Sequence, residues 1–147
     1  MSTPRARRTG TTHPVDVVAT FLATLEARDV DAALELVSPD IVYRNVPLPP
    51  ARGVAAFEKQ IRTLETWFSG FEATIHHIAA EGGTVLTERT DVLERGRIRA
   101  GFWVDGTFEV VDGRITSWTD RFDWATVVAA TGAGVARAAW GAVTGRP

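Results

Sequence analysis

The chain has no cysteine among its 147 residues and only one tyrosine, Tyr43. The absence of cysteine excludes disulfides, zinc sites built on thiolates and a cysteine nucleophile. A strong charge imbalance is also absent: the formal net charge is -2, which gives no electrostatic reason to expect nucleic acid or an anionic membrane as a partner. No uninterrupted apolar run reaches the length needed to cross a bilayer.

The N-terminal segment is basic at residues 4–8, but a polar stretch follows it where a secretion signal would have an apolar one. We therefore expect a cytoplasmic protein. Its length and its hydrophobic fraction of 45% suit one domain with a substantial core. We expect a disordered arm at residues 1–12, the domain at residues 13–130 and a tail with a weak helix at residues 131–147.

Apolar residues recur at helical spacing in three segments of the N-terminal half. The first segment predicts a helix at residues 14–27, because a proline suits the first helical turn. The second predicts a short helix that Asp29 caps and that extends to Val37, where Pro39 stops it. The third predicts a helix at residues 54–67 with one apolar face.

The C-terminal half alternates between apolar and polar residues, which is typical of strands. Strands are expected at residues 41–45, 72–80, 84–93, 98–111 and 114–122. Short turns join most of them, so neighbours should be antiparallel, and an Ala-rich helix interrupted at Gly132 and Gly134 should follow. The prediction is an α+β fold with a curved mixed or antiparallel sheet wrapped around the N-terminal helices, forming a cone with a deep apolar pocket.

Two of these strands carry charged residues where a purely structural strand would carry apolar ones. Side chains alternate along a strand, so Arg89 and Asp91 share a face. In the last strand Trp118, Asp120 and Phe122 share a face by the same rule. An aspartate between two large aromatics is sheltered and needs a partner. If both strands lie in one sheet, Arg89 can sit between Asp91 and Asp120.

Tyr43 and Asn45 also share one face of a short strand. The polar residues expected to line the pocket are therefore Tyr43, Asn45, Arg89, Asp91 and Asp120. The candidate pocket wall comprises Trp118, Phe102, Phe108, Phe122, Leu64 and Trp67. Each of these residues could have a purely structural role. A tyrosine is often a core aromatic, an asparagine is often a turn residue, and an ion-pair network can simply link strands. Only their combination is specific.

No metal site is expected from the sequence. His76 and His77 are adjacent in a predicted strand and should face opposite ways, so they cannot both bind one metal from there. Structural or surface roles are the expectation for both.

Three segments stand out as a set: YRN at residues 43–45 followed by VPLPPARG, LTERTDVL at residues 86–93, and GRITSWTDRFD at residues 113–123. Together they resemble the limonene epoxide hydrolase family, within the nuclear transport factor 2-like (cystatin-like) cone folds. The resemblance spans about residues 14–124 and is nearest to the mycobacterial members. Arg121 departs from it, because an aromatic is expected after the aspartate, and the Gly-rich tail has no counterpart.

The resemblance implies a homodimeric epoxide hydrolase without metal or cofactor, in which water attacks a lipophilic epoxide and gives a vicinal diol. It implies that Tyr43 and Asn45 hold the water, that Asp120 is the base, that Asp91 is the acid and that Arg89 lies between them. Terpenoid, steroid-like and fatty-acyl epoxides all suit an aromatic pocket.

Two other functions fit the same fold. A proton-transfer isomerase or polyketide cyclase would use a single aspartate base with hydroxyl donors, and it has no evident need for an arginine flanked by two acids. A non-catalytic dimer that binds lipophilic ligands would use the charged residues only to join strands.

Overall fold

The computed structural model describes residues 13–144, so the arm predicted at residues 1–12 lies outside the described residues. Its helices are α2 (Pro14–Glu26), α3 (Val30–Leu34), α4 (Val54–Trp67) and α5 (Trp124–Thr144). Its strands are β1 (Val37–Val46), β2 (Ala51–Arg52), β3 (Gly70–Glu81), β4 (Thr84–Arg95), β5 (Ile98–Val111) and β6 (Arg114–Arg121). The three predicted N-terminal helices are present, and the third has the predicted bounds.

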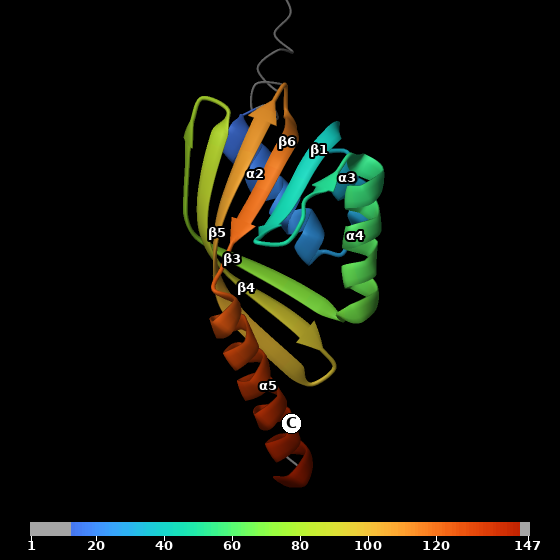
Figure 1. Cartoon of the computed structure of the whole chain (residues 1–147), viewed down its shortest axis with the longest axis vertical. Helices are drawn as coiled ribbons and strands as arrows, with labels where there is room; N and C mark the ends of the chain where they lie inside the picture. The colour runs from blue at the N-terminus through green and yellow to red at the C-terminus, as the bar shows by residue number, and fades with distance from the viewer. Residues whose placement is uncertain (1–12, 145–147) are drawn as a thin grey trace, which may run out of the picture.

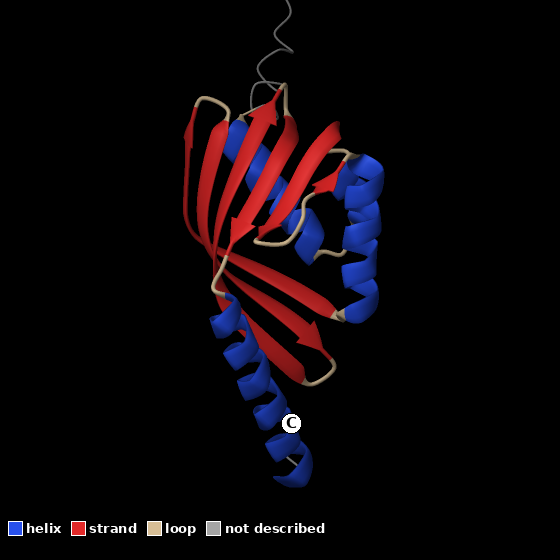
Figure 2. Ribbon diagram, in the orientation of Figure 1, coloured by secondary structure: helices blue, strands red, loops and turns tan. Residues whose placement is uncertain are grey.

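The six strands form one curved, unclosed sheet in the order β2-β1-β6-β5-β4-β3. Strands β3 to β6 follow one another as antiparallel neighbours, whereas β1 runs parallel to β6. In Figures 1 and 2, α2 lies behind the upper part of the sheet and α4 stands at its side, near β1 and β2. The predicted α+β fold, with a mixed curved sheet packed against N-terminal helices, is confirmed.

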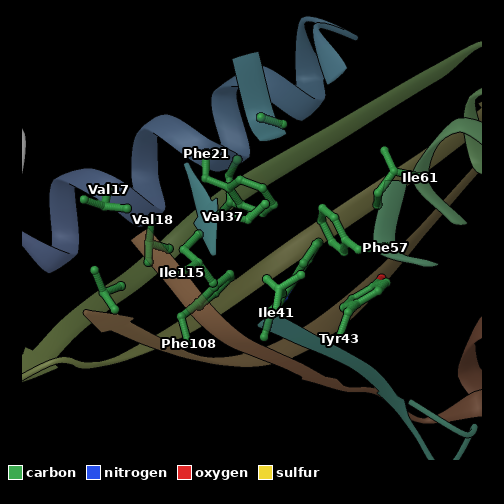
Figure 3. Close-up of a cluster of buried hydrophobic side chains, with 14 of the residues drawn as sticks. Val17, Val18, Phe21, Val37, Ile41, Tyr43, Phe57, Ile61, Phe108 and Ile115 are labelled. Atoms are coloured by element: carbon green, nitrogen blue, oxygen red, sulfur yellow. The ribbon is translucent and has the colours of Figure 1, made fainter. Parts of the chain in front are cut away.

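The core lies between the sheet and the two long N-terminal helices (Figure 3). Phe21 of α2 and Phe57 of α4 are fully buried, and their ring centres lie 6.3 Å apart. The ring of Phe21 also meets Trp118 of β6 edge-on at 5.2 Å. Burying a side chain of this size stabilises the fold by about 1.5–3 kcal/mol. The helices therefore fix the positions of β1 and β6, which carry part of the predicted site.

Strand β1 begins earlier than predicted, because the short helix α3 ends at Leu34 and does not extend to Val37. Val37 pairs with Ile115 of the parallel strand β6 instead, so tertiary pairing overrides the local helical pattern. Pro39 is accommodated within the strand because the register shifts between Val37 and Val42. The Asp29 cap is as predicted, since its side chain accepts a hydrogen bond from the backbone of Ala32.

Helix α5 is continuous, whereas the sequence predicted a break at Gly132 and Gly134. Asp123 begins the helix, and its carboxylate accepts a hydrogen bond from the backbone N–H of Ala125 at 2.9 Å. A glycine inside a helix costs about 1 kcal/mol relative to alanine, so two of them weaken this helix but need not end it. Although α5 has 21 residues, neither it nor any other helix within residues 13–144 is long and apolar enough to cross a membrane.

Close packing against the sheet explains why residue 134 is a glycine. Strand β6 pairs with β5 from Asp105 to Val111, and α5 runs alongside the rest of β5 (Figure 1). A Cβ atom at Gly134 would lie 2.6 Å from the carbonyl oxygen of Arg99, so only glycine allows this close approach. Arg137 donates a hydrogen bond to the same carbonyl at 3.3 Å. The helix thereby covers a sheet edge, which would otherwise expose unpaired backbone groups.

Candidate active site

Arg89 lies at the centre of a buried polar cluster, and its side chain is 0% exposed. Its Nε donates to Asp91 Oδ1 at 3.0 Å, and its Nη2 donates to Asp91 Oδ2 at 2.7 Å and to Asp120 Oδ2 at 2.9 Å. Its Nη1 donates to Asp120 Oδ1 at 3.3 Å and to the Thr87 hydroxyl at 3.2 Å. A guanidinium has five N–H donors, and here each has an acceptor. The predicted meeting of Arg89, Asp91 and Asp120 is present in the structure.

Arg89, Asp91 and Asp120 form what we call the acid–arginine cluster. Both aspartates are 5% exposed. With both carboxylates ionised the cluster carries one net negative charge, whereas one retained proton makes it neutral. Burying a net charge is costly. The neutral form of the cluster is therefore the less costly one to bury.

The arginine must reach across a whole strand, because β5 lies between β4, which carries Arg89, and β6, which carries Asp120. Gly106 of β5 pairs with Thr87 on one side and with Asp120 on the other. A Cβ atom there would lie 2.5 Å from Arg89 Nη1, 2.7 Å from Thr87 Oγ1 and 2.8 Å from Asp120 Oδ1. The missing side chain thus provides the space that the cluster occupies.

Thr87 and Gly106 are not among the residues predicted from the sequence. The available signals were a glycine inside a predicted strand, which often marks a close approach, and a threonine on the same face as Arg89. Thr87 also donates a hydrogen bond to the carbonyl of Gly106 at 3.4 Å, so both contribute to the support of the arginine.

Burial raises the pKa of Asp120, and the charge of Arg89 opposes this without cancelling it. For Arg89, burial works against the charged form, but hydrogen bonds and charges from both aspartates outweigh it and raise the pKa. Burial and then the nearby charge of Asp120 raise the pKa of Tyr43. Tyr43 therefore keeps its proton and can donate a hydrogen bond, while a carboxylate with a raised pKa is a stronger base.

Strand pairing brings Tyr43 and Asn45 to the cluster. In the parallel pair β1–β6, Asn45 lies opposite Asp120 and Tyr43 lies opposite Trp118. Asn45 Nδ2 donates to the Tyr43 hydroxyl at 2.9 Å, and the hydroxyl lies 3.3 Å from Asn45 Oδ1. The Tyr43 ring is buried near Phe57 (Figure 3). All five predicted catalytic side chains thus come from neighbouring positions of three strands.

Four of the predicted pocket residues lie near this cluster. Phe108 and Trp118 are 0% and 3% exposed, so they belong to the packed core. Phe102 lies opposite Asp91 in the β4–β5 pair. Its ring centre is 5.6 Å from that of Phe122, and both rings are half-buried. These two phenylalanines are therefore more accessible than Phe108 and Trp118.

The other two predicted pocket residues, Leu64 and Trp67, lie on α4 and are 37% and 57% exposed. The Trp67 ring contacts the guanidinium of Arg95 at 5.2 Å from the ring centre. Leu64 lines a surface hollow of about 440 Å³, and Phe122 lines another of about 350 Å³ beside Trp103. The acid–arginine cluster lines neither hollow, so the deep apolar pocket stays a prediction.

The prediction that His76 and His77 face opposite ways is wrong, because the register of β3 shifts just before His77. Both rings reach the outer face of β4: His76 Nε2 lies 2.7 Å from the Thr90 hydroxyl, and His77 Nδ1 lies 3.2 Å from Glu88. The His76 ring also stacks on Trp103 at 5.1 Å. Both histidines are exposed, as the expected surface role requires. Within residues 13–144, no group of three or more His, Asp or Glu side chains could hold a metal ion.

The fold defines the class of protein first. A crystal structure of a nuclear transport factor 2-like protein of unknown function from Burkholderia pseudomallei K96243 matches with a TM-score of 0.71, covering 80% of this chain and 96% of that chain. The two sequences are 16% identical, so this match shows the fold alone. The chain is an α+β protein of the nuclear transport factor 2-like class with an acid–arginine cluster buried in its sheet.

Three closer comparisons identify the family. The limonene-1,2-epoxide hydrolase catalytic domain matches residues 12–132. Epoxide hydrolase EphG of Mycobacterium tuberculosis (strain ATCC 25618 / H37Rv) is 45% identical over 106 residues, which are 72% of this chain and 70% of that protein. The solved structure of an M. tuberculosis LEH-like epoxide hydrolase has a TM-score of 0.79 and 40% identity, covering 84% of this chain and 92% of that chain. The chain belongs to the limonene epoxide hydrolase family, and its enzyme class is epoxide hydrolase.

Proposed function

We propose that this epoxide hydrolase works without a cofactor and in one step, in which water attacks an epoxide carbon with help from one acid and one base. The product is a vicinal diol, with inversion at the attacked carbon. The observation that carries the proposal is that Asp91 and Asp120 are both held by one buried guanidinium. Opening an epoxide with water needs a deprotonated carboxylate and a protonated one at the same time, and a shared proton supplies both.

Asp120 is the base in this scheme. Tyr43 and Asn45 hold a water by hydrogen bonds, and Asp120 removes its proton as the water oxygen forms a bond to the epoxide carbon. The pairing of Asn45 with Asp120 across β1 and β6 supports this placement. The raised pKa of Asp120 supports it further, since it strengthens the carboxylate as a base.

Asp91 is the acid. As the carbon–oxygen bond of the epoxide breaks, the protonated Asp91 gives its proton to the leaving oxygen. The reaction then leaves Asp120 protonated and Asp91 ionised, and proton exchange with solvent restores the starting state. Arg89 orients both carboxylates through its hydrogen bonds and stays charged throughout, as its raised pKa requires.

The substrate class is a small lipophilic epoxide, for which Phe102 and Phe122 offer apolar contacts beside Asp91. A proton-transfer isomerase on this fold needs one acidic base, so it leaves the second aspartate and the arginine without a role. The family assignment and the paired acids together favour hydrolysis.

We also propose a homodimer in the cytoplasm. Large apolar side chains are exposed on the outer face of β4 and β5 and on α5, and they support self-association because exposed apolar surface can mark an interface. They include Leu86, Val111, Trp140 and Val143. Sedimentation equilibrium tests this proposal: a mass near twice 15.9 kDa is expected, and a monomer at all concentrations would contradict it.

The single variants Asp120→Asn and Asp91→Asn test the chemistry. Each should lower diol formation by about 10²- to 10⁴-fold, because positioned acid–base help is typically worth that much. Circular dichroism should show an intact fold. Asp105→Asn is the matched control, since Asp105 is an exposed aspartate on the outer face of β5. Terpenoid, steroid-like and fatty-acyl epoxides form the substrate panel. Full turnover by either cluster variant would refute the acid–base assignment.

A further inference from the structure

The indole of Trp118 donates a hydrogen bond to the proposed base. Its Nε1 lies 2.7 Å from Asp120 Oδ1, and both side chains are buried on the same face of β6. From the sequence, Trp118 is predicted to be part of the pocket wall. The contact shows that its polar edge faces the acid–arginine cluster instead.

Neighbouring rings hold the indole in one orientation. Strand β6 lies between β1 and β5, so Tyr43 stacks on Trp118 from one side at 4.4 Å and Phe108 stacks from the other at 5.5 Å. Phe21 of α2 meets the indole edge-on. A ring packed in this way has no freedom to change rotamer, so the direction of its N–H is fixed.

As a result, the two carboxylate oxygens of Asp120 accept different numbers of hydrogen bonds. An ionised carboxylate oxygen has about two lone-pair positions. Trp118 Nε1 and Arg89 Nη1 donate to Oδ1, so both of its positions are filled. Oδ2 accepts only from Arg89 Nη2 among the described side chains, which leaves one lone pair. Only Oδ2 can accept a proton without losing a hydrogen bond.

We propose that Trp118 is a positioning residue that makes Oδ2 the basic oxygen of Asp120. By filling Oδ1 the indole directs proton transfer to one oxygen, and by bonding the charged form it keeps Asp120 ionised at lower pH. This inference rests on the proposed function for its catalytic meaning. The hydrogen bond itself does not depend on which substrate the enzyme uses.

Few other groups can affect this titration. The charged or titratable groups that face Asp120 are Arg89 and Asp91 from β4 and Tyr43 from β1. Strand β5 presents Gly106 there, which does not titrate, and α2 presents apolar side chains. A change of pH profile on removing the indole N–H is therefore attributable to Asp120 and its partners.

The variant Trp118→Phe keeps an aromatic ring in the stack and removes the N–H. We expect kcat to fall about ten- to a hundredfold, because the oxygen that accepts the proton is no longer fixed in place, while KM changes little. The acid limb of the pH profile of kcat/KM should move to higher pH, because the charged form of Asp120 loses a donor. A purely structural role would not move this limb.

Trp103→Phe is the matched control. Trp103 donates its indole N–H to Asp105, also two residues further along the strand, at 3.1 Å on the outer face of β5. The same chemical change there should leave kcat and the pH profile as in the wild type. A Trp118→Phe enzyme with the wild-type acid limb would overturn the proposal.

An NMR titration gives a readout that needs neither turnover nor the Trp118→Phe variant. In the wild type the indole N–H resonance of Trp118 should shift with pH as Asp120 is protonated. The variant Asp120→Asn should abolish this pH dependence, and the control variant Asp105→Asn should retain it. The absence of such a resonance would overturn the proposal. If the wild type turns over no epoxide but the resonance behaves as expected, the hydrolase proposal fails and the Trp118–Asp120 bond stands.

Discussion

Gly106 shows how much a single residue position decides in this protein. Its φ is not in the left-handed region, so backbone freedom does not explain the glycine. The explanation is space, because the guanidinium of Arg89 passes over this position to reach Asp120. A protein interior is close-packed, so a methyl group added here has to displace Arg89 and Asp120, which are hydrogen-bonded to each other.

Gly106→Ala should therefore damage both stability and activity. Overpacking of this kind costs about 1–3 kcal/mol in the free energy of unfolding, and displacing the cluster should reduce diol formation by about 10²-fold. Gly101→Ala is the control, because its Cβ would meet Val92 Cγ2 at an ordinary 3.5 Å. Urea denaturation and initial rates measure both effects. A fully active Gly106→Ala enzyme would show that the cluster does not need this space.

At the residue scale, alternation along the strands was enough to place Arg89, Asp91 and Asp120 on inward faces. It was not enough to find the roles of Thr87, Gly106 or the Trp118 indole. Those roles depend on which residues lie opposite one another across β4, β5 and β6, and strand register is a tertiary property that a local pattern does not contain.

Helix α5 shows the same limit at the scale of an element. Two glycines predicted a break in it, yet the helix continues because it packs along β5. The two glycines differ in their surroundings. A Cβ at Gly132 meets nothing within 4 Å, whereas a Cβ at Gly134 would lie 2.6 Å from the Arg99 carbonyl oxygen.

Alanine at these two positions should have opposite effects. Gly132→Ala should raise the free energy of unfolding by about 1 kcal/mol, because alanine favours the helix and nothing blocks it. Gly134→Ala should lower it by about 1–3 kcal/mol through the clash with β5. Thermal unfolding followed by circular dichroism measures both. Equal shifts in the same direction would contradict the packing of α5 on β5.

The start of β1 was misjudged for a related reason. The residues after Asp29 favour a helix locally, and the strand forms only because Val37 has a partner in β6, far away in the sequence. Local signal and tertiary pairing agree at the Asp112–Gly113 turn, where both residues have positive φ and where the short connection expected between two strands joins the antiparallel pair β5 and β6.

At the scale of the whole molecule, the acid–arginine cluster ties β4 to β6 across β5 and places charge inside the fold. The α+β class followed from short turns and from the change from helical to strand periodicity. The parallel pairing of β1 with β6, which brings Asn45 beside Asp120, did not follow from them. The residues of the cluster could therefore be chosen from the sequence, whereas their geometry depends on the fold.

Buried Asp120 should make global stability depend on pH in a defined direction. Its pKa is about 3.9 when unfolded and is raised in the folded protein. Between these two values the folded state holds more protons, so this contribution is full below about pH 3.9 and is lost as pH rises through the folded pKa. Exposed Glu72, whose pKa is lowered by Arg99, acts in the opposite sense.

The difference between the wild type and Asp120→Asn isolates this contribution. The free energy of unfolding of the wild type, relative to the variant, should decrease as pH rises above about 4. Urea denaturation at a series of pH values measures it. A difference that is constant or that increases with pH would mean that Asp120 is not a carboxyl with a raised pKa in the folded protein.

Direct attack of water on the epoxide is the central claim, and a single-turnover reaction in ¹⁸O-labelled water tests it most directly. With enzyme in excess over epoxide, the label should appear in the diol after one turnover, and mass spectrometry of the protein should find none in Asp91 or Asp120. Label in an aspartate, with unlabelled diol from the first turnover, would show a covalent ester and contradict the mechanism.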